Sequence, residues 1–369
     1  MNSFNQNLAA RLRVAAMPLP SVAVGFDGFV DEMISVVGER QSLTAFTAVP
    51  DITTFGGLVA KAAGHSSLRE IVLNAVYPGG CAVNMGDGLA ALGVPVDAFA
   101  TLGQPSHPAF ATVIAGFRSS HSWGNDPGRT IAFEFNDGKL MFSAVSQLAD
   151  FTPAHVEKML ADGAYAAACA QARVIALTDW TLYPHMTAVW KLLQEKVYSR
   201  LHHRPQFFID LVDPSSRSSA DLRAMLDTLP AFAATGSLTL GLNGNEANIL
   251  ARLFDLPEAD DHPAAALAQA QALQARLGIA EVVIHHIKSA AVANATETMA
   301  MRGPYCALPK RSTGAGDRFN AGYCLGQLLQ LDARSRLTCA CASSGFFVSQ
   351  ARSVTLAELA DFIETLPTE

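Results

Sequence analysis

The chain has 369 residues, of which 50% are hydrophobic and 16% are charged, so it is long enough to bury a large core. The formal net charge is −7 and no dense basic run occurs, which argues against nucleic acid or an anionic membrane as the partner. Six cysteines are scattered without zinc-ligand spacing, and we interpret them as the reduced thiols of a cytoplasmic protein. We expect neither a signal peptide nor a membrane span, because no apolar run has the required length.

Two acidic residues, Asp27 and Asp31, follow the first predicted strand, 21–25, which is apolar and β-branched. Acids just beyond the end of a parallel strand lie where α/β proteins place ligand-binding groups. The alternative is a surface turn in which these aspartates cap nearby N–H groups. Residues 33–54 then carry a mixed pattern with short β-like pieces.

A pair of glycines, Gly79 and Gly80, ends the next predicted strand and precedes a helix rich in alanine and leucine. That helix carries Asn84 in its first turn and ends at Gly93, as helices with a glycine cap do. Cys81 lies beside the glycines, but no activating base is near it in the sequence, which argues against a nucleophilic cysteine.

Most other segments alternate between strand and helix patterns, and one hairpin turns at 136–138. The remaining predicted strands are 96–102, 174–178, 207–212, 238–242 and 282–287. The predicted helices include 8–16, 55–63, 108–117, 152–171, 184–197, 218–229, 264–277 and 319–331. This alternation predicts a mostly parallel sheet with helices on both faces and right-handed connections.

Polar residues mark the ends of two later strands. Asn243 and Glu246 offer oxygen ligands that suit a hard cation which keeps several waters. The alternative is that Asn243 only caps the following helix. His285 and His286 are neighbours on a strand and point to opposite faces, so we interpret them as packing or backbone-bonding histidines and not as ligands of one metal ion.

The most informative stretch, 312–322, reads Ser-Thr-Gly-Ala-Gly-Asp-Arg-Phe-Asn-Ala-Gly. Glycines directly before a helix leave backbone N–H groups uncovered, and the helix N-terminus adds a partial positive charge. The amides of Gly314, Ala315 and Gly316 are therefore expected to hold a developing anion, with Asp317 as a general base beside it. The alternative is a strand-to-helix turn in which Asp317 is only an N-cap.

Together, residues 79–84, 243–246 and 312–322 resemble the signatures of the ribokinase-like (PfkB) carbohydrate kinases. The resemblance implies a three-layer α/β/α ribokinase-like fold, with a mostly parallel sheet, helices on both faces and a small β lid. It implies one domain, 1–369, whose lid segments are about 33–54 and 118–145. It also implies an ATP-dependent phosphotransferase that phosphorylates a hydroxyl group of a sugar or related polyol, with Asp317 as the base.

The resemblance also implies a role for each motif residue. The acceptor is expected to meet Asp31 as the first candidate and Asp27 as the second, together with Gly79, Gly80 and Asn84. The nucleotide side is expected to include Asn243, Glu246, Lys288, Thr313 and Ser344. Since Glu246 is expected to hold Mg²⁺ through water, the expected cofactors are ATP and Mg²⁺.

One position departs from the pattern of this family. Many members carry an aspartate that helps to bind potassium six residues before the catalytic aspartate, where this chain has Arg311. A guanidinium is permanently charged and cannot ligate a cation. We therefore predict activity largely independent of potassium, with Arg311 ordering the loop; the alternative is that Arg311 points into solvent.

Two other functions stay open from the sequence alone. One is a nucleoside kinase of the same fold, and the other is a catalytically silent regulator that binds a sugar or nucleotide, against which the retained Asp317 argues. We expect a small-molecule sugar or nucleoside as partner, and a homodimer through the lid is an arrangement that the family uses. Neither a P-loop nor an early Gly-x-Gly-x-x-Gly motif occurs, which argues against those nucleotide folds.

Overall fold

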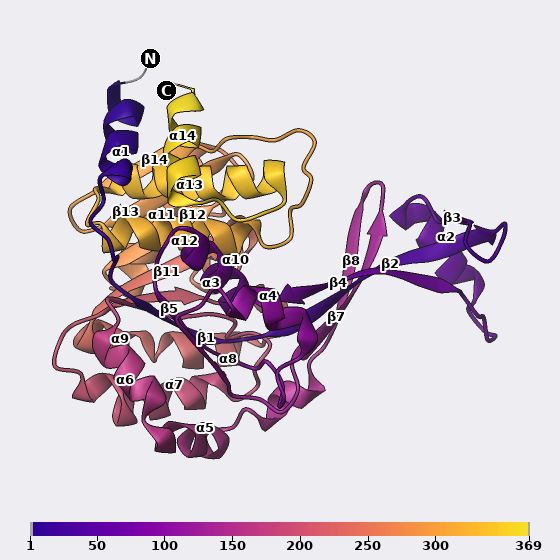
Figure 1. Ribbon diagram of the computed structural model, residues 1–369, viewed down its shortest axis with the longest axis horizontal. Coiled ribbons are helices and arrows are strands. Elements are labelled where there is room, and N and C mark those ends of the chain that lie inside the picture. The colour runs from indigo at the N-terminus through magenta and orange to yellow at the C-terminus, as the bar shows by residue number, and fades with distance from the viewer. Residues whose placement is uncertain (1–2, 368–369) are drawn as a thin grey trace.

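The computed structural model describes residues 3–367 and is built around a nine-stranded sheet (Figure 1). The strands follow the order β14-β13-β12-β11-β10-β9-β1-β5-β6. Those from β6 to β12 pair in parallel, whereas β13 and β14 add antiparallel strands at one edge. Their bounds are β1 Val22–Phe26, β5 Val96–Ala100, β6 Ser119–Ser122, β9 Val174–Leu177, β10 Gln206–Asp210, β11 Ser237–Asn243, β12 Glu281–His285, β13 Ser289–Asn294 and β14 Thr298–Arg302.

Helices cover both faces of this sheet, because successive strand residues point to opposite sides. The helices that pack on one face are α5 Pro153–Met159, α6 Ala164–Gln171, α7 Met186–Lys196, α8 Ser219–Leu226, α9 Leu229–Thr235, α10 Gly244–Leu253 and α11 Pro263–Leu277. The helices on the other face are α1 Ser3–Arg13, α3 Cys81–Ala91, α12 Ala315–Leu328, α13 Ala333–Gln350 and α14 Leu356–Thr365. A short helix, α4 Ala111–Ile114, follows β5.

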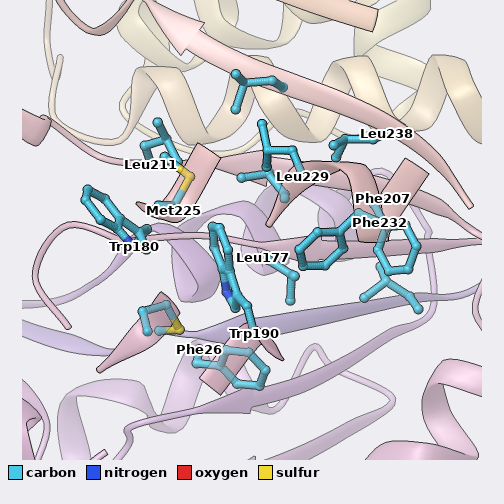
Figure 2. Close-up of a cluster of buried hydrophobic side chains, with 14 of the residues drawn as sticks. Phe26, Leu177, Trp180, Trp190, Phe207, Leu211, Met225, Leu229, Phe232 and Leu238 are labelled. Carbon is cyan, nitrogen blue, oxygen red and sulfur yellow. The ribbon is translucent and has the colours of Figure 1, made fainter. Parts of the chain in front are cut away.

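The core on the first face is rich in large aromatic side chains. Trp180, Trp190, Phe207 and Phe232 are fully buried there, and Trp190 meets Phe232 edge to face (Figure 2). Complete burial of a large apolar side chain contributes about 1.5–3 kcal/mol relative to exposure. This packed body therefore holds the ends of the parallel strands in fixed positions.

A second, five-stranded sheet extends away from the body, and we name it the projecting sheet (Figure 1). Its strands are β2 Phe29–Arg40, β3 Phe46–Ala48, β4 Ile71–Gly79, β7 Gly128–Phe135 and β8 Gly138–Ala144. Helix α2, Ile52–Lys61, packs on it through Phe55, which contacts the rings of Phe133 and Phe135. Much of the rest is open, and Tyr77 and Phe142 are among its exposed apolar side chains.

The predicted layers are confirmed, since a mostly parallel sheet lies between two layers of helices. Two local predictions differ from the structure. The helix expected over 152–171 is interrupted by a 3₁₀ turn, because Gly163 has a φ of 74°, which a continuing helix does not allow. Short β-like pieces are expected within 33–54, whereas residues 33–40 belong to one continuous strand, β2, which begins at Phe29.

Within residues 3–367, no helix is both long and apolar enough to cross a membrane. The six cysteines are free thiols in this structure.

Candidate active site

The start of α12 presents backbone donors beside a buried carboxyl group. Gly314 has a φ of 90°, a left-handed conformation that favours glycine, and the helix begins at the next residue. The Ala315 amide already donates to the Ser312 carbonyl at 3.0 Å. In the described chain, the amides of Gly316 and Asp317 make no hydrogen bond, as the first-turn geometry of a helix dictates.

The prediction for Ala315 therefore needs correction. Its N–H is used to close the turn before the helix, so it does not face an incoming anion in this structure. The free donors beside Gly314 belong to Gly316 and Asp317. The expected anion site therefore keeps the Gly316 amide and uses the Asp317 amide in place of that of Ala315.

Asp317 lies in the first turn of α12 and is only 7% exposed. Burial raises its pKa to about 7, and the nearby Asp210 carboxylate adds to this shift while Arg318 opposes it. A carboxyl group with such a pKa can accept a proton near neutral pH, which is the requirement for a general base.

The two aspartates after β1 have different surroundings. Asp27 Oδ1 accepts hydrogen bonds from the Ala82 amide at 2.8 Å and from Thr178 Oγ1 at 2.6 Å, while Oδ2 accepts from the Cys81 amide. Asp27 therefore caps α3 from a distant part of the chain, and both of its carboxylate oxygens are occupied. Asp31 has a side-chain hydrogen bond with Thr130 and no backbone donor among the described residues, so it keeps more acceptor capacity for a ligand than Asp27 does.

Asp31 is held on β2 opposite Tyr77 of β4, so the two side chains share one face of the projecting sheet. Its carboxylate lies over Gly79, where an added Cβ would come within 2.5 Å of it. Gly80 turns the chain with a φ of 94° into α3. The two glycines are therefore required so that Asp31 can lie close to the start of α3.

Asn84 links this region to the start of α12. Its side chain is buried, and its Nδ2 atom would lie 3.6 Å from a Cβ placed on Gly314. Two motifs that are separated by more than two hundred residues thus meet at one point, as the resemblance implies. Cys81 lies in the same region, but burial and the Asp317 carboxylate raise the pKa of its thiol well above the usual value, which opposes a nucleophilic role.

Asn243 and Glu246 form a capping box at the start of α10. The Asn243 amide donates to Glu246 Oε2 at 2.8 Å, its Nδ2 donates to Oε1 at 2.7 Å, and the Glu246 amide donates to Asn243 Oδ1 at 3.0 Å. The predicted helix cap is therefore present. Burial and the neighbouring Asp210 carboxylate raise the pKa of Glu246 well above its usual value. An oxygen-rich group with excess negative charge fits a hard cation.

A cavity of about 840 Å³ opens beside the start of α12. Its lining includes Asn243, Ser312, Gly316, Tyr305 and Ser344. Three of the predicted nucleotide-side residues, Glu246, Lys288 and Thr313, are not part of this lining. The Lys288 ammonium group lies over the Tyr305 ring, 4.9 Å from its centroid. Lys288 is therefore next to the cavity, since Tyr305 is part of the lining.

Three residues near the site were not assigned from the sequence. Asp179 and Asp210 are buried at the ends of β9 and β10, and Asp210 accepts a 2.6 Å hydrogen bond from Asn320 Nδ2. The position of both aspartates at the ends of predicted strands is the sequence feature that could identify them as site residues. His285 was interpreted as a packing or backbone-bonding residue; it stacks on Phe319 and also lines the cavity.

Arg311 connects the loop before α12 to the projecting sheet. Its guanidinium carbon lies 5.0 Å from the Tyr77 ring centroid and 5.5 Å from that of Phe347. In the part of the chain that the structure describes, its guanidinium forms no salt bridge or hydrogen bond, and burial lowers its pKa. The alternative that Arg311 points into solvent is therefore wrong.

Comparison with known proteins gives a consistent result. A model of the prokaryotic ketohexokinase family matches residues 6–366. A ketohexokinase of Haloferax volcanii is 28% identical over 344 residues, which cover 92% of this chain and 90% of that protein.

Solved structures show the same fold. A ribokinase of Arabidopsis thaliana, complexed with ribose and ATP, aligns with a TM-score of 0.63 and 17% identity over 95% of this chain and 100% of that one. A putative ribokinase II of E. coli, in complex with ATP and Mg²⁺, aligns with a TM-score of 0.58 and 17% identity, covering 94% and 100% of the two chains.

Proposed function

This chain belongs to the prokaryotic ketohexokinase family and is a sugar kinase, and from that premise we propose that it transfers the γ-phosphoryl group of ATP to a hydroxyl group of a ketohexose. Two observations support this proposal: Asn84 lies beside Gly314 at the start of α12, where Asp317 and the free amides are, and Asp31 lies over Gly79 directly before α3. An acceptor held there has a carboxylate on one side and a base with an anion site on the other.

Each residue is assigned a part of the transfer. Asp31 and Asn84 hold the acceptor by hydrogen bonds to its hydroxyl groups, with the close approach that Gly79 and Gly80 permit. Asp317 removes the proton from the attacking hydroxyl, and the amides of Gly316 and Asp317 donate to the transferred group. Phosphoryl transfer depends mainly on such positioning and charge stabilisation.

ATP occupies the cavity beside α12 in this proposal, with Ser344 and Tyr305 toward the base and Asn243 toward the phosphates. Glu246, held by Asn243, would bind Mg²⁺ through water, and the raised pKa of Glu246 and Asp210 supports a need for positive charge there. When bound, the ion neutralises phosphate charge. Thr313 supports the nucleotide side as part of the loop that precedes the free amides. Lys288 supports it through its contact with the Tyr305 ring.

The projecting sheet acts as the lid over the acceptor, within a single domain. Its exposed Leu73, Val76, Met141 and Phe142 support pairing between two copies through this sheet. Six free thiols and the use of ATP support a cytoplasmic location.

The test is ATP turnover with a panel of ketohexoses, aldohexoses and nucleosides, measured as ADP release. We expect turnover with at least one ketohexose and none with nucleosides. Turnover only with nucleosides would instead support the nucleoside kinase. Thermal stabilisation by sugars without any turnover would support a silent binder.

A further inference from the structure

His285 is the last residue of β12 and lies beside the anion site. It pairs in register with Asn243, the last residue of β11, and both side chains line the nucleotide cavity. A Cβ placed on Gly316 would lie 3.2 Å from His285 Cε1 and 3.3 Å from Nε2. The tip of the imidazole ring is therefore in contact with the glycine that supplies a free amide.

The ring is held in this position by stacking. Its centroid lies 4.8 Å from that of Phe319, one turn further along α12, with the planes tilted by 35°. The neighbouring His286 has a different role, since its ring lies against Gly244 at the start of α10. The two histidines are thus separated, and within the described residues they belong to no cluster of three or more His, Cys, Asp or Glu side chains that could hold a metal ion.

The nitrogen atoms of His285 are free for a ligand. No hydrogen bond joins either of them to another residue of the described chain. Burial lowers the pKa of His285 to about 4, and His286 adds to this effect. The ring is therefore neutral near pH 7, with one nitrogen that donates and one that accepts.

We propose that His285 donates a hydrogen bond to a phosphoryl oxygen of ATP in the transition state, beside the amide of Gly316. This inference rests on the proposed function, because it requires the phosphates of ATP at the start of α12. The closeness of the ring to Gly316 places it beside the expected anion site, in the lining of the cavity. A neutral donor also suits a site that already holds the Asp317 and Asp210 carboxylates, because it adds a donor without a further charge.

Two substitutions of His285 separate its role as a hydrogen-bond donor from the packing of its ring. His285→Phe keeps an aromatic ring against Phe319 but removes the donor, whereas His285→Gln keeps an N–H donor and loses the ring. We expect His285→Phe to lower kcat about 10- to 100-fold, the usual effect of losing one donor to a charged group, with the KM for the sugar unchanged. His285→Gln is expected to stay within roughly fivefold of the wild type. His202→Phe, at an exposed histidine outside the cavity, is the matched control and should be silent.

Two kinetic results would overturn the proposal. One is a kcat for His285→Phe within about twofold of the wild type, and the other is an equal loss in His285→Gln and His285→Phe, which would indicate a packing role. If the variants do not fold, a structure of the wild-type enzyme with a non-hydrolysable ATP analogue decides. A ring nitrogen within hydrogen-bonding distance of a β- or γ-phosphate oxygen supports the proposal, and any other contact rejects it.

The variant Asp317→Asn distinguishes a failure of the His285 inference from a failure of the proposed active site. If Asp317→Asn is nearly inactive while His285→Phe is normal, only the inference on His285 fails. If Asp317→Asn retains full turnover, the proposed active site itself fails.

Discussion

The two sides of the candidate active site are built in different ways. The phosphate side uses backbone amides and buried carboxylates at the start of α12, which packs between α3 and α13. The proposed acceptor side includes Asp31 of the projecting sheet, whose cross-strand neighbour Tyr77 is 42% exposed. In the proposed function, the chemistry common to every acceptor is thus fixed in the packed body, which also holds Asn84, whereas Asp31 places part of the acceptor selection on a thin sheet whose side chains can change at little cost to the core.

The largest effect should come from the phosphate side. Asp317→Asn keeps the size of the side chain but removes the base, so kcat should fall by roughly two to four orders of magnitude with the fold and ATP binding retained. Initial-rate kinetics and the melting temperature of the same preparation check this. Near-normal turnover of a folded variant would show that Asp317 is not the base.

The acceptor side should respond differently. Asp31→Asn and Asn84→Ala remove hydrogen bonds to sugar hydroxyls, each worth about 1–3 kcal/mol, so the KM for the sugar should rise about 5- to 150-fold while that for ATP stays nearly constant. Asp27→Asn is the matched control. It replaces a carboxylate oxygen that caps α3 by an NH₂ group, so it should lower the melting temperature more than Asp31→Asn does. If only the KM for ATP changed, Asp31 and Asn84 would belong to the nucleotide side instead.

The pH dependence tests the role of Asp317 on the phosphate side. The pKa of Asp317, raised to about 7, lies above its ordinary value, so the ionised base disappears as the pH falls below 7. We expect kcat/KM to fall about tenfold per pH unit below that point and to level off above it. Asp210→Asn removes a negative charge that raises this pKa, so the acid limb should move to lower pH. A profile that is flat from pH 5 to pH 8 would contradict the assignment of Asp317.

The smallest effect is expected where the two sides meet. Arg311 lies between Tyr77 of the projecting sheet and Phe347 of the body, and we propose that its fixed charge takes the place of a bound ion. Initial rates in sodium-free buffer, at constant ionic strength, should therefore be the same with and without potassium. Activation by several-fold would show that an ion site survives beside Arg311.

Much of the fold and the main motifs could be predicted from the sequence. The family match confirms the resemblance to ribokinase-like carbohydrate kinases, and the alternation of strands and helices predicted the sheet and its two helical layers. These features depend on local patterns, such as the glycines before Asp317, whose effect on the backbone is felt within one turn of helix.

The remaining features depend on contacts between distant residues. Asp27 and Asp31 are alike in sequence, and only the approach of α3 shows that Asp27 is a helix cap. The Ala315 amide is lost to the anion site through its bond to Ser312, a detail of turn geometry. The position of His285 beside Gly316 follows from the packing of β12 against α12, which no local pattern in the sequence specifies.

Hydrogen exchange, measured by mass spectrometry with each ligand in turn, tests the division between the two sides most directly. A ketohexose should slow exchange in β2 and β4, residues 29–40 and 71–79, with little change along 303–314. A non-hydrolysable ATP analogue should slow exchange in 303–317 and leave β2 and β4 nearly unchanged. If the sugar left β2 and β4 unprotected, the acceptor would not be held by the projecting sheet, and the proposed division of the site would be wrong.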